Sequence, residues 1–267
     1  MKNKSLELLT SQEVRVVIGY EKGTKCSTRP SFFFLPEDIE RMVFDEECKN
    51  NLAVYLTKEN IKNYGRLAII ANDKTLQSIV KLISENQIRE DNLFVLTPGS
   101  EDGQVIVLNS IEEIKSFVNK SIPSQKEPDS VDELVARIRK MSREERWKYW
   151  QDEFARCIRC YACRAACPLC YCTRCTVESS QPQWVPVASH VLGNMEWHII
   201  RAMHMSGRCT DCGACAEACP VNINLQALTR VVRESIQDEF NLTTEEYLEG
   251  NNVLSSFKPN DNETFIR

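Results

Sequence analysis

Two copies of one cysteine string constrain what this chain of 267 residues can fold into. Each string reads Cys-x2-Cys-x2-Cys-x3-Cys-Pro, and the second begins 52 residues after the first. Two intervening residues let consecutive thiolates converge on the corners of one small cube, and the proline turns the last cysteine away. This spacing is typical of loops that bind [4Fe-4S] clusters. The first string holds Cys157, Cys160, Cys163 and Cys167, and the second string holds Cys209, Cys212, Cys215 and Cys219.

The two strings together predict a crossed arrangement of ligands. In the bacterial ferredoxin pattern, three thiolates of a string bind one cluster and the fourth cysteine reaches across to the other. Cluster 1 is thus predicted to be bound by Cys157, Cys160, Cys163 and Cys219. Cluster 2 is predicted to be bound by Cys209, Cys212, Cys215 and Cys167. A zinc ribbon is the main alternative, but zinc favours paired Cys-x2-Cys knuckles rather than triplets completed by Cys-Pro.

Three more cysteines follow the first string directly, and they leave two interpretations open. Cys170, Cys172 and Cys175 could bind a third centre, either a [4Fe-4S] cluster or a zinc ion, or they could be plain thiols that shield the other clusters. A third centre needs a fourth ligand, for which the candidates are Cys26, Cys48, His190, His198 and His204. Cys48 is preferred, because it precedes a helix-like stretch whose N-terminus would favour a thiolate.

Composition and charge exclude several classes of protein. The chain is 27% charged and 42% hydrophobic, which is ordinary for a globular protein. It has no signal-peptide pattern and no run of about 18 apolar residues, so we expect a cytoplasmic protein without membrane insertion. Many of its 13 cysteines lie close together in the sequence. This indicates cysteines that bind metal in a reducing, anaerobic cytosol rather than cysteines that form disulfides. The net charge of −5, without a basic stripe, argues against nucleic acid as a partner.

Residues 1–120 are predicted to form a small α/β domain. Strand-like runs cover Val14–Tyr20, Leu67–Ala71, Leu93–Leu96 and Val105–Leu108. The helical pattern between the second and third runs predicts a βαβ unit with parallel strands. Because no glycine-rich phosphate loop follows any of these strands, we do not expect nucleotide binding through such a loop.

The rest of the chain is predicted to be mostly helical. Residues 121–150 are interpreted as a linker and helices, 151–240 as a dicluster ferredoxin-like domain, and 241–267 as a polar tail. The fold class is therefore α+β. Capping boxes at Ser130 and Ser142 are predicted to start two helices, and Trp147, Trp150 and Phe154 are predicted to form a core face of the second helix. Each of the three histidines is expected to cap a helix or to pack, rather than to bind metal.

Several segments resemble bacterial members of the deazaflavin-dependent hydrogenase/dehydrogenase beta-subunit family that are fused to a dicluster ferredoxin domain. The resemblance spans residues 14–240. The matching segments are Cys157–Cys172, Gln181–Trp184, Arg201–Gly213, Val17–Gly23, Cys48–Leu56 and Ser84–Arg89. The chain departs from the family at Ala71–Leu76, where the family has Lys-Gly-Cys-Asp-Ser-Arg, and it lacks the family's glycine- and cysteine-rich segment after Pro98.

The resemblance implies an iron-sulfur electron-transfer subunit of a soluble anaerobic multi-subunit oxidoreductase, of the transhydrogenase, formate dehydrogenase or heterodisulfide reductase type. Such a subunit passes single electrons between a partner's flavin and clusters or ferredoxin, so the implied partners are flavin- or cluster-containing subunits and ferredoxin. The departures imply a degenerate flavoprotein domain that has no flavin and is kept for assembly, and no catalytic residue is assigned. The alternative is a flavin-containing subunit that exchanges hydride with a nicotinamide or deazaflavin carrier.

Overall fold

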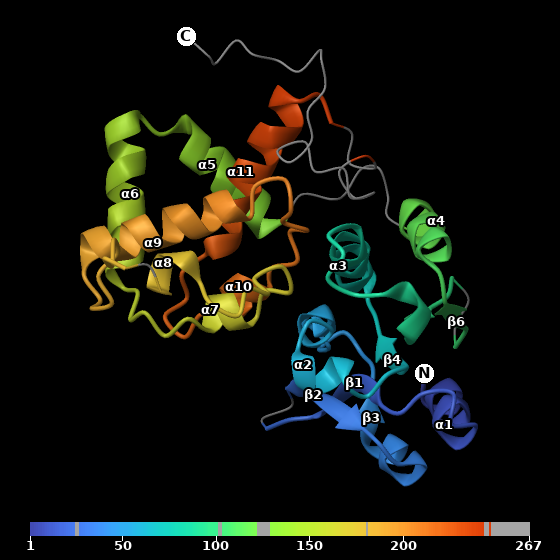
Figure 1. Cartoon of the computed structure of the whole chain (residues 1–267). Helices are drawn as coiled ribbons and strands as arrows, with labels where there is room; N and C mark the ends of the chain where they lie inside the picture. Colours follow the sequence, from blue (N-terminus) through green and yellow to red (C-terminus); the bar gives the residue numbers. More distant parts are fainter. Residues whose placement is uncertain (25–26, 101–102, 122–128, 180, 243–245, 247–267) are drawn as a thin grey trace. The chain divides into compact units, whose positions relative to one another are not determined.

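The computed structural model describes residues 1–267 except 25–26, 101–102, 122–128, 180, 243–245 and 247–267. Cys26, most of the predicted linker and most of the predicted polar tail therefore lie outside the described residues. The chain divides into two compact units, one built on Met1–Pro123 and the other on Ser124–Tyr247. In Figure 1 the first unit runs from blue to green and the second from green to red.

One mixed β-sheet forms the centre of the first unit. Its strand order is β2-β1-β4-β5-β6, and β3 pairs with β1 off this path. The pairs β1–β4 and β4–β5 are parallel, whereas β1–β2, β1–β3 and β5–β6 are antiparallel. The strands are β1 (Val17–Lys22), β2 (Thr28–Phe33), β3 (Met42–Val43), β4 (Leu67–Ile70), β5 (Leu93–Pro98) and β6 (Val105–Leu108).

The predicted βαβ unit is confirmed. Helix α3 (Asp73–Ser84) connects the parallel strands β4 and β5, and its apolar side chains Leu76, Ile79 and Val80 are buried. The other helical elements of this unit are α1 (Lys2–Thr10), α2 (Glu59–Lys62), α4 (Ile111–Ser121) and the 3-10 helices η1 (Pro36–Arg41), η2 (Leu52–Tyr55) and η3 (Glu90–Asn92). The helix-like stretch predicted after Cys48 is thus a single 3-10 turn that begins four residues later.

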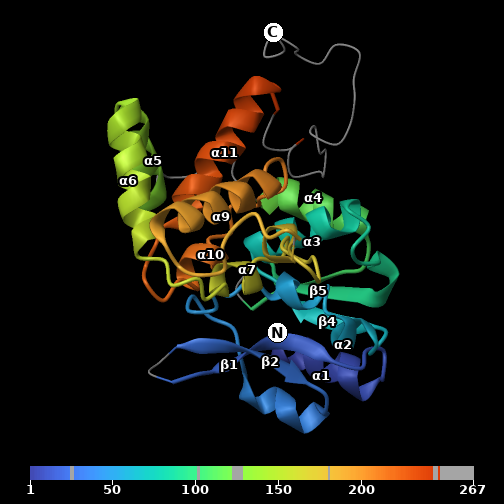
Figure 2. The ribbon, with the colours of Figure 1, turned by 60° about the vertical axis from the view of Figure 1, so that its left-hand side comes forward.

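The second unit consists of helices. These are α5 (Ser130–Lys140), α6 (Arg143–Ala155), α7 (Ala162–Ala165), α8 (Thr176–Ser179), α9 (Val191–His204), α10 (Ala214–Glu217) and α11 (Leu225–Glu239). Helix α6 packs on α9, and α5 packs on α11 (Figures 1 and 2). The helices before the first string therefore belong to the same unit as both strings, and the α+β fold class is confirmed. Among the described helices, none is both long and apolar enough to cross a lipid bilayer.

Two details of α5 and α6 differ from the sequence prediction. The capping box of α5 uses Asp129 and Asp132, one residue before the predicted pair, whereas the box at Ser142 is as predicted. Trp147 is 52% exposed, so its placement in the core is wrong. Because α6 contacts two core groups, its buried face is centred on Trp150, with Phe154 on one side and Tyr149 on the other.

Candidate iron-sulfur site

The two strings fold into the same backbone. Arg159 and Asp211, the third residues of the two strings, have φ of 58° and 55°, and the fifth residues, Tyr161 and Gly213, have φ of 59° and 77°. In each string the backbone N–H of the third residue donates to the sulfur of the first cysteine at 3.4 Å. Helix α7 then follows in the first string and α10 in the second. Loops with N–H groups donated to sulfur are suited to cluster binding, since such bonds stabilise thiolate charge.

Cys167 of the first string lies among the thiols of the second string. One small cavity is lined by Cys167, Cys209, Cys212 and Cys215. Burial raises the pKa of Cys209 to about 11, and the thiolates of Cys212 and Cys167 add to this shift. Burial also raises the pKa of Cys215, with Cys167 again among the contributing charges. The fold therefore brings together the four cysteines predicted for cluster 2.

Cys219 of the second string lies near the thiols of the first. Burial raises the pKa of Cys163 to about 11, and the thiolates of Cys157, Cys219 and Cys160 raise it further. Cys157 is likewise affected by Cys160 and Cys219, after the larger effect of burial on its pKa. The sulfur of Cys219 also accepts a backbone N–H from Ile223 at 3.3 Å. The four cysteines predicted for cluster 1 are thus neighbours as well.

The donor set fits iron-sulfur clusters better than single metal ions. None of the described cysteines is in a disulfide. Within the described ranges, no three His, Cys, Asp or Glu side chains are close enough to one another to surround one metal ion. A zinc ion needs its sulfur ligands at about 2.3 Å, whereas a cubane holds four thiolates apart at its corners. The all-thiol donor set of the two strings therefore fits iron-sulfur clusters.

His198 of α9 contacts the first string. Its Nε2 lies 3.3 Å from the sulfur of Cys157. A ligating thiolate can only accept a hydrogen bond, so Nε2 carries the proton in that state. The ring stacks on Phe154 at 4.5 Å and is buried, which lowers its pKa to about 3, with the charges of Arg201 and Arg159 contributing. The histidine is packed, as predicted, and with its proton on Nε2 the neutral ring would donate a hydrogen bond to a predicted ligand.

Other polar residues around α9 hold the first string in place. Asn194 donates to the carbonyl oxygens of Phe154 and Cys157 at 3.0 and 2.9 Å. The buried Arg159 donates to the carbonyl oxygens of Gly193 and Pro186 at 3.0 and 2.9 Å. Sequence reasoning missed these roles. The available signal was that polar residues recur every three or four positions along one face of an otherwise apolar helix.

Arg201, also on α9, lies between the two groups of thiols. It is 6% exposed, its Nη2 donates to the carbonyl oxygen of Cys163 at 3.1 Å, and it lines the same cavity as Cys167 and Cys215. Burial alone lowers the pKa of this guanidinium, but the thiolates of Cys167, Cys215, Cys170 and Cys163 outweigh burial and raise it. Arg201 continues the polar spacing of Asn194 and His198 along α9, but no motif in the sequence indicated that a cation would face the thiols.

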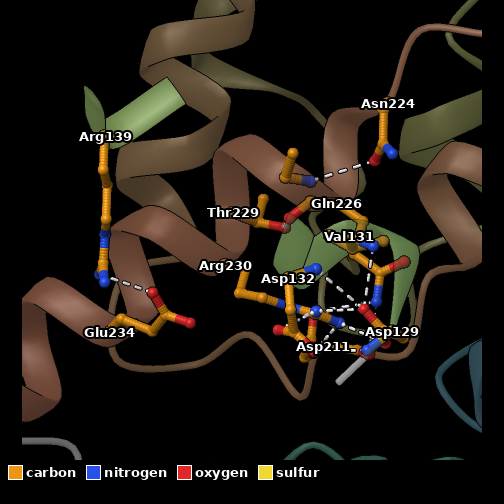
Figure 3. A network of polar contacts seen from close by, with 11 residues as sticks. Asp129, Val131, Asp132, Arg139, Asp211, Asn224, Gln226, Thr229, Arg230 and Glu234 are labelled. Atoms are coloured by element: carbon orange, nitrogen blue, oxygen red, sulfur yellow. Dashed lines mark hydrogen bonds and ion pairs between the residues drawn. The ribbon is translucent and has the colours of Figure 1, made fainter. Parts of the chain in front are cut away.

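A third buried arginine, Arg230 on α11, ties the second string to α5 (Figure 3). Its guanidinium pairs with Asp129 at 2.7 Å, with Asp132 at 2.6 Å and with Asp211 at 2.7 Å. Gln226 also donates to the carbonyl oxygen and the carboxylate of Asp211, at 3.0 and 2.9 Å. The turn of the second string is therefore anchored to helix α11 and to the N-terminus of helix α5.

The three cysteines after the first string have different surroundings. The side chain of Cys170 bonds to the thiol of Cys167, which lowers the pKa of Cys167, and both sulfurs lie within 4.0 Å of the sulfur of Met205. Cys172 is exposed, whereas Cys175 packs against a core group of the second unit. Cys170 is thus a neighbour of a predicted cluster 2 ligand.

The candidates for a fourth ligand of a third centre are placed as follows. His190 caps α9 by accepting the backbone N–H of Gly193 at 3.2 Å, and His204 is exposed. Cys48 is buried in the first unit, where its sulfur accepts the backbone N–H of Asp45 at 3.4 Å. Burial raises the pKa of Cys48, which is opposite to the thiolate-favouring effect expected from a helix N-terminus.

In the first unit, side chains of the chain itself occupy the junction of β4 and α3. The side chain of Asn72 accepts the backbone N–H of Thr75 at 3.0 Å and donates to the carbonyl oxygen of Cys48 at 3.4 Å. Asn51 donates to the carbonyl oxygen of Lys74 at 3.3 Å. A separate cavity includes Leu67 and Leu93, at the amino ends of β4 and β5. Ligands of open α/β sheets bind at the opposite, carboxyl ends of strands.

Comparison with known proteins supports the site in the second unit. Residues 153–223 match the 4Fe-4S dicluster domain family. Over 214 residues the chain is 27% identical to the F420-dependent formate dehydrogenase subunit beta of Methanocaldococcus jannaschii, an alignment that covers 76% of this chain. The aligned part is 56% of the relative, so the chain spans little more than half of that protein's length. The prediction that both strings belong to an iron-sulfur domain is confirmed.

Proposed function

We propose that this chain is an electron-transfer subunit of a multi-subunit oxidoreductase, in which it passes single electrons between a partner's flavin and other clusters or ferredoxin. Bound [4Fe-4S] clusters supply one-electron chemistry. The residues of the chain position these clusters, shield them from water and donate hydrogen bonds to their thiolates. The observation that carries this proposal is the presence of two groups of four cysteines in a domain of the 4Fe-4S dicluster family.

The crossed ligation is part of the proposal. Cys157, Cys160, Cys163 and Cys219 would hold cluster 1, and Cys209, Cys212, Cys215 and Cys167 would hold cluster 2. The proximity of Cys167 to the second string and of Cys219 to the first supports this assignment. Each string then contributes to both clusters, which keeps the two clusters close together in one rigid unit.

The first unit is proposed to serve assembly rather than flavin chemistry. Its alignment with the formate dehydrogenase subunit supports descent from a deazaflavin-dependent beta subunit, because 214 aligned residues extend well beyond the 71 residues from 153 to 223. At the β4–α3 junction, however, Asn72 caps the helix that a phosphate group would otherwise approach. This supports a flavoprotein fold that has lost its cofactor.

The alternative of a retained flavin is favoured by one observation, since the similar archaeal protein is named for its dependence on F420. Absorption spectra of the anaerobically purified full chain test between the two. Our proposal expects broad cluster absorption without flavin bands, and no turnover of nicotinamide or deazaflavin by the chain alone. Flavin bands together with hydride exchange would overturn it in favour of the alternative.

The partners are proposed to be flavin- or cluster-containing oxidoreductase subunits, with ferredoxin as a further electron carrier. Anaerobic purification of the tagged chain from its native cell, followed by identification of bound proteins, tests this. We expect a redox subunit to be retained and to reduce the clusters when its own substrate is added. Reduction by none of the bound proteins would contradict the proposal.

A third centre at Cys170, Cys172 and Cys175, with Cys48 as fourth ligand, stays a prediction. Metal analysis would give about twelve irons per chain, or about eight irons and one zinc. About eight irons without zinc, unchanged in Cys172→Ser and Cys48→Ser variants, would show that these thiols only pack around the other clusters. Cys172 is the better residue to replace because Cys170 contacts Cys167.

A further inference from the structure

Arg201 is a buried cation that faces thiols rather than carboxylates. Nη2 of its guanidinium donates to the carbonyl oxygen of Cys163 at 3.1 Å, and its side chain also bonds to Cys170. Its buried Nε has no hydrogen-bond partner among the described residues. Among the described residues, no Asp or Glu lies within ion-pair distance of it. The charged neighbours that act on it are instead the thiols of Cys167, Cys215, Cys170 and Cys163.

Two other arginines of this unit are paired with carboxylates, whereas the buried Arg159 donates to the carbonyl oxygens of Gly193 and Pro186 instead. Arg230 contacts three carboxylates, and Arg164 of α7 pairs with Glu178 at 2.6 Å. An uncompensated buried charge is strongly destabilising, so a buried cation needs an anion or several hydrogen-bond acceptors facing it. The only anions that the described structure offers Arg201 are thiolates, three of them from predicted ligands of clusters 1 and 2, and this points to a bound cluster as its counter-ion.

We propose that Arg201 is the counter-ion of cluster 2 and raises the reduction potential of that cluster. This inference rests on the proposed function, and it names a residue that sets the reduction potential of one of the two clusters. One electron delivered by a partner's flavin or cluster adds one negative charge to cluster 2 and none to the protein. A fixed cation beside the ligands Cys167 and Cys215 stabilises the reduced state more than the oxidised state. Arginine keeps its proton throughout, so no proton accompanies the electron.

We expect the charge of Arg201 to raise the reduction potential of cluster 2 more than that of cluster 1. Arg201 lines the cavity that contains all four predicted ligands of cluster 2, whereas of the cluster 1 ligands only Cys163 is prominent among its charged neighbours. Cys160 of cluster 1 is also exposed, so water screens charges on that side. Removal of the guanidinium should therefore change the two potentials unequally.

The test is a potentiometric titration of the full chain, followed by electron paramagnetic resonance, in wild type, Arg201→Met and Arg201→Lys. In Arg201→Met the midpoint potential of cluster 2 should fall, so that at the wild-type midpoint the ratio of reduced to oxidised cluster 2 drops roughly tenfold or more. The midpoint of cluster 1 should fall less. Arg201→Lys keeps the charge and should restore most of the wild-type value.

Arg156→Met provides the matched control, because Arg156 is an exposed cation next to the first string and its loss should leave both midpoints unchanged. Unchanged midpoints in Arg201→Met, or equal shifts in the Met and Lys variants, would overturn the proposal. Iron and sulfide analysis checks that each variant contains its clusters. If Arg201→Met does not bind them, Arg201→Gln replaces it and is judged by the same criteria. Because the titration uses mediators and no partner protein, its result is independent of whether the chain transfers electrons to the proposed partners.

Discussion

The two cysteine strings have the same spacing and the same backbone turns, but their surroundings differ. The first string lies against aromatic rings and the neutral His198, and its middle cysteine, Cys160, is exposed. The second string is anchored through Asp211 to the buried Arg230, and it shares a cavity with Arg201. Identical ligand spacing thus fixes the type of cluster, while the helices that pack on each string can give the two clusters different accessibility and potential.

Removal of iron should have the largest effect, and the two clusters should lose their iron at different rates. Because Cys160 is exposed while Cys212 is only partly accessible, a chelator should remove the iron of cluster 1 before that of cluster 2. Iron content should therefore pass through a plateau near half of its starting value, with the resonance signal of cluster 2 still present. Simultaneous loss of both signals would contradict a difference in accessibility.

Loss of the ion-pair network at Arg230 should be the next largest effect. Arg230→Met leaves Asp129, Asp132 and Asp211 without their cation and should lower the free energy of unfolding of the second unit by about 3–5 kcal/mol. Hydrogen exchange during denaturation measures this change in each unit separately. Arg139→Met is the matched control, because Arg139 forms an exposed pair with Glu234, and exposed pairs contribute about 0.2–1 kcal/mol. Equal effects of the two substitutions would show that the network does not anchor the second string.

A smaller effect is expected at Gly213, which has Tyr161 as its counterpart in the first string. Gly213 has a φ of 77°, and an added Cβ would lie 2.9 Å from Oε1 of Gln226. Gly213→Ala should destabilise the second unit by more than the backbone strain of about 1–2 kcal/mol. Gly65→Ala isolates that strain, since Gly65 has a φ of 78° and open space around it. If denaturant unfolding shows that both substitutions lower the free energy of unfolding by the same amount, the contact with Gln226 does not contribute to the effect.

The smallest effect is expected at His198. His198→Phe keeps the stacking on Phe154 but removes the N–H donated to Cys157, a bond worth on the order of 1 kcal/mol. The midpoint potential of cluster 1 should fall while that of cluster 2 changes less, the reverse of the order expected for Arg201→Met. The same redox titration measures both variants. A larger shift of cluster 2 would contradict the position of His198 at the first string.

Local patterns predicted much of this molecule. The alternation of strand and helix around Leu76 predicted the βαβ unit, and the ferredoxin spacing predicted two similar loops, because both depend on residues close in sequence. Features that depend on packing were not predictable in this way. Trp147 fits a helical core pattern but lies outside the face that α6 buries.

The site residues show the same limit. The spacing of His198 and Arg201 marks a polar face of α9, but it does not show that this face packs against the two strings. The preference for Cys48 assumed a helix N-terminus that would favour a thiolate. In the structure only a 3-10 turn follows, from Leu52, and burial raises the pKa of this thiol. Its part in a third centre stays a prediction for metal analysis.

The most direct measurement of the central claim compares the resonance spectra of four serine variants of the reduced full chain. Crossed ligation predicts that Cys219→Ser alters the same signal as Cys160→Ser, because both cysteines would bind cluster 1. It also predicts that Cys167→Ser alters the same signal as Cys212→Ser, because both would bind cluster 2. If Cys219→Ser instead matched Cys212→Ser, and Cys167→Ser matched Cys160→Ser, each string would bind its own cluster and crossed ligation would be wrong.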